Sequence, residues 1–382
     1  MLKALDNPQK KLRSVQVVGT NGKGTTAVTL AGALEASGHP AGAYLSPHLI
    51  SYTERVRLGG FEAAEDEFAA GMGRAIRAAD EHEIPASQFE LLTAGALLMF
   101  AETGLSWAVL EAGLGARYDA TSAAEPEVVV LTNVGLDHTE YLGDTVEDIA
   151  TEKLASLREG ATLVLGSDDQ AVIEIARQRC ESVGAKLVEA GNASLEPDEA
   201  PRLAPYARRN VALGLRAAET LLGYKASPEI GRRAVAGATL PGRFEVREHL
   251  GAPIVIDGGH NPSGLAAALD GVRSVFEGRP VAVVFGALRD KDIPSMLLAL
   301  KGEADALTLT RPANARAAEP GWIEREFGPR DARGRRAVLV SEAGEAIDRS
   351  AREASRTGGV VLATGSLYTA AEALKHVCGV SS

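Results

Sequence analysis

Short runs of Val, Ile and Leu alternate with longer Ala-rich stretches along most of the chain, and this alternation constrains the fold more than any other feature. The short runs have the length and β-branched character of buried strands, whereas the longer stretches carry apolar residues at helical spacing. Regular alternation of strand and helix indicates βαβ units around a mostly parallel sheet. We therefore predict an α/β protein.

The first part of the chain shows this alternation up to about residue 222. We expect strands at residues 15–19, 41–45, 107–111, 127–132 and 161–165, and helices at 24–37, 63–81, 87–102, 146–157 and 208–222, with a polar, irregular segment at 190–205. Polar, glycine-containing loops follow the third and fourth of these strands. Open α/β sheets bind ligands at such loops, so we expect a site there.

A second series of strands begins after the segment LPGRFEV, residues 240–246, which carries both Pro and Gly. We place a domain boundary near residue 246. The strands expected beyond it are 254–257, 281–285, 306–310, 337–340 and 360–363. We therefore predict two domains, 1–246 and 247–382, of which the second is a smaller, Rossmann-like doubly wound sheet.

Composition narrows the classes of partner. The 382 residues include 40 Lys and Arg against 51 Asp and Glu, and the resulting formal charge of −11 disfavours binding to a nucleic-acid backbone. Cys180 and Cys378 lie far apart in no CxxC pattern, which fits a reducing compartment. The N-terminal sequence has no apolar leader, and no apolar run approaches the roughly 18 residues of a membrane helix. We expect a cytoplasmic protein without nucleic-acid or membrane partners.

The segment VQVVGTNGKGT, residues 15–25, is the strongest local indication of function. A β-branched strand leads into a glycine-rich turn, where backbone N–H groups and a helix N-terminus can surround a phosphate while a lysine and a threonine serve the outer phosphates and Mg²⁺. The spacing departs from the standard GxxxxGK[ST] pattern, and a plain turn with a solvated lysine is the alternative. We predict a P-loop ATPase-like cradle for ATP made by Gly19, Thr20, Asn21, Gly22, Lys23, Gly24 and Thr25.

Glu111 ends the apolar strand 107–111 with a charge, as a Mg²⁺ ligand beside nucleotide phosphates would. A solvated or helix-capping glutamate is the alternative. The following GLGAR, residues 113–117, partly imitates a dinucleotide-binding fingerprint, but Tyr118 occupies the position of its last glycine. We reject a dehydrogenase on that ground.

Three further residues remain ambiguous on their spacing alone. His138 is more typical of a structural loop histidine, and Lys153 of a solvated lysine on a helix. Arg243 is equally compatible with a hinge surface and with a phosphate contact. In DGGHNPSG, residues 257–264, polar groups again gather where a strand ends and a proline begins a helix.

A series of motifs in order from about residue 7 to about residue 368 resembles the Mur ligase superfamily, specifically its folate branch of dihydrofolate synthases and folylpolyglutamate synthases. The motifs are GTNGKGT, SPHL, ERVRLGG, FELLTAGAL, EAGLGARYDAT, GLDHTEYLG, EK at 152–153, LPGRFE, DGGHNPSG, GALRDKD and TGSLY. Such a series is far more specific than any one motif.

The resemblance implies roles for the ambiguous residues. Thr25 and Glu111 match residues that hold Mg²⁺ with the phosphates, and His138 matches one that helps to hold a second Mg²⁺. Lys153 matches a lysine that becomes carbamylated, which requires a neutral amine and hence a depressed pKa. The remaining implied contacts are Arg243 and Asp257 with the nucleotide, Asn210 near the adenine, His260 and Ser366 with glutamate, and Ser46 and His48 of SPHL with the substrate.

The implied activity is an ATP-dependent amide ligase that adds L-glutamate to dihydropteroate, to tetrahydrofolate polyglutamates or to both. ATP activates the carboxylate as an acyl phosphate, and ADP and phosphate are released. Both steps build negative charge on oxygens, which Lys23, Arg243 and one or two Mg²⁺ would stabilise. Lys153 and His138 would take part in catalysis through the metal. We expect a monomer.

Two departures keep other functions open. Only 14 residues precede the first expected strand, so we expect part of the pterin-side wall or of a stabilising helix to be absent. Tyr206 and Ala207 replace the usual His-Gln ahead of Asn210. Ala116 and Tyr118 also stand where Gly and Leu are common. The alternatives are a Mur-type ligase acting on a UDP-muramyl substrate and a non-catalytic nucleotide-binding homologue.

Overall fold

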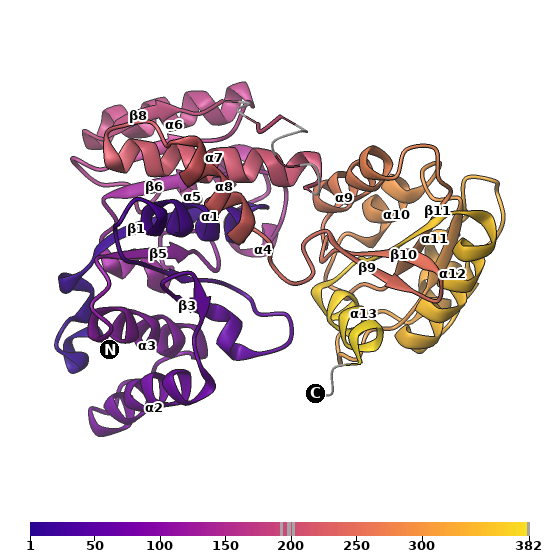
Figure 1. Cartoon of the computed structure of the whole chain (residues 1–382), viewed down its shortest axis with the longest axis horizontal. Coiled ribbons are helices and arrows are strands. Elements are labelled where there is room, and N and C mark those ends of the chain that lie inside the picture. The colour runs from indigo at the N-terminus through magenta and orange to yellow at the C-terminus, as the bar shows by residue number, and fades with distance from the viewer. Residues whose placement is uncertain (192–193, 197–199, 201–202, 380–382) are drawn as a thin grey trace. The chain divides into compact units, whose positions relative to one another are not determined.

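The structure, a computed structural model, describes residues 1–191, 194–196, 200 and 203–379. The chain forms two compact units, the first made of residues 1–200 and 207–238 and the second of residues 201–206 and 239–382. Each unit has its own sheet covered by helices (Figure 1). The junction expected near residue 246 falls within strand β9, Glu245–His249, which belongs to the second unit. Part of the segment 190–205, expected to be irregular, lies outside the described residues.

The first unit is built on an eight-stranded sheet in the order β4-β3-β2-β5-β1-β6-β7-β8. All neighbours from β2 to β8 pair in parallel, whereas β3 pairs antiparallel with β2 and β4. The strands are β1 Arg13–Val18, β2 Ala41–Tyr44, β3 Val56–Leu58, β4 Phe61–Glu62, β5 Trp107–Glu111, β6 Val128–Leu131, β7 Thr162–Leu165 and β8 Lys186–Glu189. Strand β6 is apolar throughout and β5 is apolar up to its final glutamate, because both faces of a parallel sheet are covered, whereas β1 also carries the buried polar residues Ser14 and Gln16.

Helices of the first unit cover its sheet on both sides (Figure 1). Helix α1 packs on β1, β2, β5 and α8, while α3 packs on β2, β5 and α2. The helices are α1 Lys23–Ala36, α2 Glu65–Glu81, α3 Gln88–Glu102, α4 Thr139–Leu142, α5 Val146–Lys153, α6 Gln170–Val183, α7 Pro205–Leu222 and α8 Pro228–Gly237. The described part of the unit also holds four 3₁₀ segments, namely η1 Leu2–Leu5, η2 Pro8–Lys11, η3 Tyr52–Arg55 and η4 Ala120–Ala124.

The second unit holds a six-stranded sheet in the order β13-β12-β11-β14-β10-β9, parallel except for β9 against β10. Helix α12 packs on β10, β11 and β14, and α9 packs on β14 and α10. The strands are β9 Glu245–His249, β10 Ala252–Ile256, β11 Val281–Phe285, β12 Ala306–Leu309, β13 Val338–Leu339 and β14 Val360–Thr364. The helices are α9 Pro262–Val275, α10 Ile293–Leu300, α11 Pro320–Phe327, α12 Ala343–Thr357 and α13 Leu367–Cys378.

The prediction of a two-domain α/β chain with mostly parallel sheets is confirmed. The helix expected at 146–157 instead ends at Lys153, because the apolar residues that follow, Leu154 and Leu157, turn into the buried core beside β6 and β7. Helix α7 begins at Pro205 rather than at residue 208, as a proline in the first turn allows.

Two findings bear on the compartment and partner predictions. Cys180 is buried, Cys378 is exposed, and both are free thiols. Within the described ranges, the chain has no helix that combines the length and the apolar character needed to span a membrane.

Candidate active site

The loop between β1 and α1 depends on two glycines. Gly19 has a φ of 146°, and a Cβ at this position would lie 1.8 Å from Thr132 Oγ1. Gly22 has a φ of 81° at the N-terminus of α1, and a Cβ there would lie 2.4 Å from Asn210 Oδ1. Larger residues are therefore excluded on both conformational and steric grounds. The turn delivers its backbone to a helix N-terminus, which is a favourable place for phosphate.

Side chains that follow β6 hold this loop in place. Asn133 Oδ1 accepts from the Asn21 N–H at 3.0 Å, and Asn133 Nδ2 donates to the Asn21 carbonyl at 2.9 Å. Thr132 Oγ1 donates to the same carbonyl at 2.7 Å, while Thr20 Oγ1 accepts from the Gly135 N–H at 3.0 Å. The loop after the neighbouring strand thus fixes the backbone of the cradle, as a binding site requires.

Two lysines converge on one carbonyl oxygen of the loop. Lys23 Nζ donates to the Gly19 carbonyl at 3.1 Å, and Lys153 Nζ donates to it at 2.9 Å. Lys153 is 5% exposed at the end of α5. Its burial, together with the charge of Lys23, lowers the pKa of Lys153 to about 7, although nearby carboxylates oppose the shift. A large fraction of Lys153 is therefore a neutral amine near neutral pH.

Oxygen donors lie on both sides of the loop. Glu111 is 6% exposed at the end of β5, opposite Val17 of β1, and its Oε2 accepts from the Ser46 N–H at 2.9 Å. Thr25 is buried in the first turn of α1, next to Gly24. A carboxylate and a hydroxyl are ligands that Mg²⁺ prefers, and a carboxylate that is buried favours a cation beside it. These residues suit the magnesium expected beside the phosphates.

His138 lies in the loop after β6 and caps the short helix α4 with a left-handed φ of 52°. Its side chain is 44% exposed, and its Nε2 lies 3.9 Å from Asp137 Oδ1. The Asp137 carboxylate also accepts from the His138 N–H at 3.0 Å. The ring thus stands at the carboxyl edge of the sheet beside an acidic partner, and its role toward a second metal stays a prediction.

Asn210 lies on α7 with its side chain against Gly22 of the loop. It is buried, and its carbonyl accepts from Thr26 Oγ1 at 3.2 Å, which ties α7 to α1. The structure therefore brings Asn210 to the cradle, although a contact with adenine stays a prediction.

His48 is packed among cationic and aromatic groups. Its Nδ1 accepts from Arg55 Nε at 2.9 Å, and its ring centroid lies 4.1 Å from that of Tyr52. Burial and the Arg55 charge lower the pKa of His48. A neutral imidazole packed near an aromatic ring is better suited to contact a planar, uncharged part of a substrate than to bind an anionic group. The substrate contacts of Ser46 and His48 stay predictions.

A second group of predicted residues gathers within the second unit, where β10 ends. Asp257 is buried, its Oδ2 accepts from Tyr206 Oη at 2.6 Å and from the Phe244 N–H at 2.9 Å, and its Oδ1 accepts from the Gly259 N–H at 2.9 Å. Burial raises the pKa of Asp257 despite these bonds and the nearby Arg243 charge. Tyr206, which departs from the family pattern, therefore has a specific partner in this chain.

The loops after β10 and β14 meet. The Gly365 N–H donates to the Gly259 carbonyl at 3.1 Å, and His260 Nδ1 lies 3.0 Å from the Gly258 carbonyl oxygen. Ser366 is 2% exposed and caps α13, its Oγ accepting from the Thr369 N–H at 3.0 Å. His260 and Ser366 thus share one sheet edge, and their contacts with glutamate stay predictions.

Sequence reasoning missed the residues that shape the loops. Thr132 and Asn133 position the phosphate cradle, and Asp119 Oδ2 accepts from the Gly113 and Leu114 N–H groups at 2.8 and 3.0 Å, which forms the turn after Glu111. For Thr132 and Asn133 the available signal was their position directly after a buried strand, because polar residues there indicate the ligand edge of the sheet.

Two known domain families match this chain. Residues 17–200 match the Mur ligase middle domain, and residues 242–367 match the Mur ligase glutamate ligase domain. The dihydrofolate synthase/folylpolyglutamate synthase of Bacillus subtilis is 30% identical over 338 residues, covering 80% of this chain and 78% of the relative.

Solved structures have a similar fold. FolC of E. coli, in complex with DHPP and ADP, superposes with a TM-score of 0.85 at 28% identity and covers 99% of this chain and 92% of its own. The bifunctional folylpolyglutamate synthase/dihydrofolate synthase of Yersinia pestis, complexed with AMPPNP and Mn ion, gives a TM-score of 0.82 at 30% identity and covers 98% and 90%.

The fold of the chain, the glycine-rich loop and the two domain matches together define an ATP-dependent ligase of the Mur type. Within that class, the sequence identity to its relatives and the share of each chain that is covered show the family. The chain belongs to the dihydrofolate synthase/folylpolyglutamate synthase family.

Proposed function

We propose that this protein joins L-glutamate to dihydropteroate, to the tail of reduced folates, or to both, with hydrolysis of ATP to ADP and phosphate. The proposal rests on the cradle of residues 19–25, whose backbone is held by Thr132 and Asn133. The Gly19 carbonyl in this loop accepts hydrogen bonds from Lys23 and Lys153. The names and ligands of the relatives support the choice of substrates.

The first step activates the acid. A carboxylate oxygen of the pteroate or folate tail attacks the γ-phosphorus of ATP, the bond to the β–γ bridging oxygen breaks, and an acyl phosphate and ADP result. The chain contributes position and charge rather than a covalent nucleophile: backbone N–H groups hold the phosphates and Lys23 neutralises their charge. Thr25 and Glu111 are the residues that would hold Mg²⁺, which would supply further neutralisation of phosphate charge.

The second step forms the amide. The amino group of glutamate attacks the acyl carbon, loses a proton, and expels phosphate from the tetrahedral intermediate. We assign Arg243, Asp257, His260 and Ser366 of the second unit to nucleotide and glutamate contacts. The match of residues 242–367 to a glutamate ligase domain supports this assignment.

Lys153 has the properties that carbamylation requires. Its neutral Nζ attacks CO₂, a carbon–nitrogen bond forms, and one proton is released, which turns a neutral amine into an anionic oxygen donor. The pKa of about 7 and the buried position beside Lys23 support this modification, because a carbamate would relieve the repulsion between the two lysines. We propose that the carbamate contributes, together with His138, to holding a second Mg²⁺.

The active form that we propose is a cytoplasmic monomer. The two free cysteines are compatible with a reducing compartment.

Mass spectrometry of products tests the proposed function. The full chain is incubated with Mg²⁺, ATP and L-glutamate, together with dihydropteroate, tetrahydrofolate or a UDP-muramyl peptide. We expect addition of one glutamate residue to dihydropteroate, tetrahydrofolate or both, with stoichiometric ADP and phosphate. Product formation only from the UDP-muramyl substrate, or nucleotide binding without any product, would contradict the proposal.

A Lys23→Met variant is the matched control for that experiment. It retains the glycine turn but loses the ammonium group at the Gly19 carbonyl, so product formation should fall by about 10²–10³. A variant as active as the parent would show that the loop does not handle the transferred phosphoryl group.

A further inference from the structure

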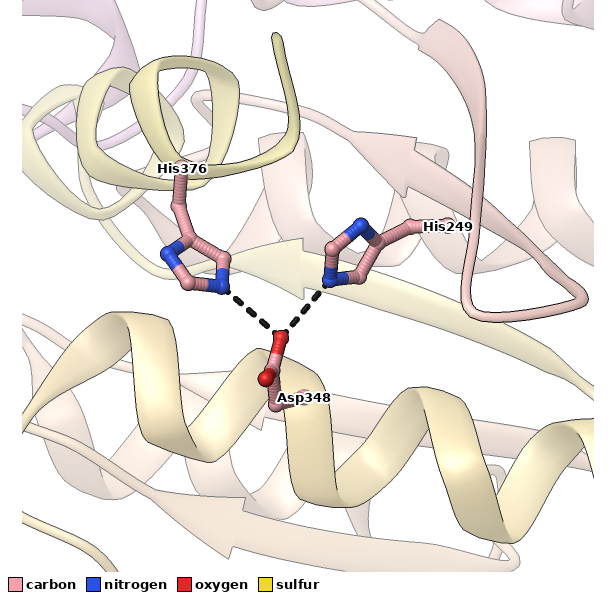
Figure 2. Close-up of side chains that lie close together, drawn as sticks. All are labelled: His249, Asp348 and His376. Carbon is pink, nitrogen blue, oxygen red and sulfur yellow. Dashed lines mark hydrogen bonds and ion pairs between the residues drawn. The ribbon is translucent and has the colours of Figure 1, made fainter. Parts of the chain in front are cut away.

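Two histidines and an aspartate converge in the second unit from three separate elements. His249 ends β9, Asp348 lies in the middle of α12, and His376 lies in the last turn of α13 (Figure 2). His249 Nε2 lies 2.7 Å and His376 Nε2 lies 2.8 Å from the same oxygen, Asp348 Oδ1. The ligand-type atoms of all three side chains lie within 4.8 Å of one another.

This cluster is separate from the ligand edge of the same sheet. His249 pairs with Ala252 at the start of β10, whereas Glu245 pairs with Ile256 at its end, directly before Asp257. The cluster therefore lies at the amino edge of the parallel strands, and the loops that carry Asp257 and Ser366 lie at the carboxyl edge. None of its members takes part in the proposed ligase reaction.

The three side chains are the donor set of a transition-metal site. Two imidazole nitrogens and one carboxylate oxygen bind Zn²⁺ and similar ions, usually with water completing the coordination. At the metal–ligand distances of roughly 2.0–2.1 Å that zinc takes, tetrahedral ligand atoms stand about 3.3 Å apart. The existing separations of 2.7 and 2.8 Å need only a small outward movement of the rings to reach this value.

The surrounding structure holds the cluster in place and leaves it accessible. A Cβ on Gly344 would lie 2.7 Å from His376 Nδ1, so the glycine makes room for this ring over the first turn of α12. Arg352 donates to the second carboxylate oxygen, Asp348 Oδ2, at 3.2 Å. The exposed fractions of the His249, Asp348 and His376 side chains are 18%, 25% and 37%, which leaves room for an ion to enter and for water to bind it.

We propose that His249, Asp348 and His376 form a binding site for a divalent transition-metal ion, with Zn²⁺ as the best-fitting member of that class. Each imidazole binds through the Nε2 lone pair and carries its proton on Nδ1, and Asp348 binds as the carboxylate. The ion joins the end of β9 and the last turn of α13 to α12. It stabilises the edge of the second unit and leaves the Mg²⁺-dependent chemistry to the first.

Metal titration of the full-length protein tests this site. The protein is freed of metal with a chelator, kept in excess Mg²⁺ to fill oxygen-ligand sites, and titrated with Zn²⁺ by calorimetry, with Co²⁺ absorption as the spectroscopic signature. We expect one tightly bound ion and a rise in Tm. His376→Gln and Asp348→Asn should weaken binding by at least about 100-fold, since even groups behind the ligands alter metal affinity by 10–100-fold.

His39→Gln is the matched control, because His39 is an exposed histidine of the first unit and should leave the affinity unchanged. Circular dichroism of each metal-free variant verifies that it is folded, and His249→Gln serves if either of the other variants is not. Equal Zn²⁺ affinity in the parent and in the folded variants would overturn the proposal. So would a parent protein that ignores Zn²⁺ while the variants melt earlier, since the cluster would then be a hydrogen-bonded tie only.

Discussion

The carbonyl oxygen of Gly19 accepts hydrogen bonds from both Lys23 and Lys153, and much of the candidate site's electrostatics follows from this arrangement. Two like charges meet in a region where Lys153 is almost fully buried, so the less costly response is for Lys153 to lose its proton. Lys23, in the first turn of α1, is the lysine to which we assign the phosphate contact.

The depressed pKa of Lys153 predicts a pH-dependent stability. In the unfolded chain this lysine stays protonated up to its ordinary pKa of 10.5, whereas in the folded chain it releases its proton near pH 7. Between these values the unfolded state binds more protons, so folding stability rises with pH. Below pH 7 the buried charge penalises the fold in full, and above pH 10.5 the penalty is gone.

Urea unfolding of the parent and of Lys153→Met at a series of pH values measures this effect. The free energy of unfolding of the parent should rise relative to that of the variant from about pH 7 to about pH 10. Identical pH dependence in the two proteins would show that Lys153 is not buried as a neutral amine.

Gly22 offers a prediction with a matched control. Gly22 and Gly38 have nearly the same φ, 81° and 82°, but a Cβ at Gly22 would meet the Asn210 side chain and a Cβ at Gly38 would meet nothing within 4 Å. Gly38→Ala should therefore lose only about 1–2 kcal/mol of stability, from the left-handed conformation. Gly22→Ala adds overpacking of about 1–3 kcal/mol.

Chemical denaturation and titration with AMPPNP compare the two variants. Gly22→Ala should be the less stable and should bind the nucleotide weakly, whereas Gly38→Ala should bind it as the parent does. Equal losses in both variants would mean that Asn210 yields freely and does not shape the cradle.

Residue identity alone predicts only part of this site. The sequence indicated Glu111 and the glycine turn because a charge at the end of an apolar strand and a Gly-rich strand-to-helix turn are each locally unusual. The pKa of Lys153 and the support from Asn133 were beyond it, because both depend on contacts more than 100 residues apart in the chain.

At the scale of elements, the hydroxyl of Ser366 has a structural partner in the first turn of α13. Its Oγ accepts from the Thr369 N–H at 3.0 Å, which is an N-cap, although the family resemblance assigns this serine to glutamate. Ser227 caps α8 in the same manner, accepting from the Ile230 N–H at 3.3 Å, in a helix to which we assign no substrate contact. Comparing Ser366 with Ser227 therefore separates helix capping from glutamate binding.

We predict that Ser366→Ala and Ser227→Ala each lose about 1 kcal/mol of stability, as N-cap substitutions do. Only Ser366→Ala should also raise the KM for glutamate, because it removes a hydroxyl at the proposed glutamate site. Thermal unfolding and steady-state kinetics measure both effects. An unchanged KM for glutamate in Ser366→Ala would leave the serine with its capping role alone.

Elements with a strong local pattern were predictable, and those that depend on tertiary contacts were not. Strand β5 was expected at its observed bounds because it is fully buried and continuously apolar up to its final glutamate. The two-residue strand β4 and its partner β3 were missed, since Phe61 and Glu62 are exposed and offer no apolar run. The early end of α5 at Lys153 follows from core packing of the residues beyond it, which helical periodicity does not report.

At the scale of the whole molecule, each unit presents polar side chains at the carboxyl edge of its own parallel sheet. In the first unit these include Lys23 and Glu111, and in the second they include Arg243 and Asp257. The side chain of Arg243 lies against the loop after β10, where a Cβ on Gly258 would stand 2.7 Å from its Nη1. The proposed reaction therefore divides between a first unit that holds the nucleotide in the loop of residues 19–25 and a second unit that adds contacts to the nucleotide and completes the chemistry.

This division predicts that binding and turnover can be separated by mutation. Arg243→Ala should reduce glutamate ligation by about 10²–10³, as loss of one charge-stabilising donor does, while AMPPNP with Mg²⁺ still protects the loop of the first unit from hydrogen exchange. Lys23→Met should lose both. Arg247→Ala is the control, because Arg247 is an exposed arginine on β9 that pairs with Glu245 and should leave turnover unchanged. If Arg243→Ala abolished the protection of residues 19–25 as well, Arg243 would be essential for nucleotide binding itself rather than for turnover, and the proposed division of labour would be wrong.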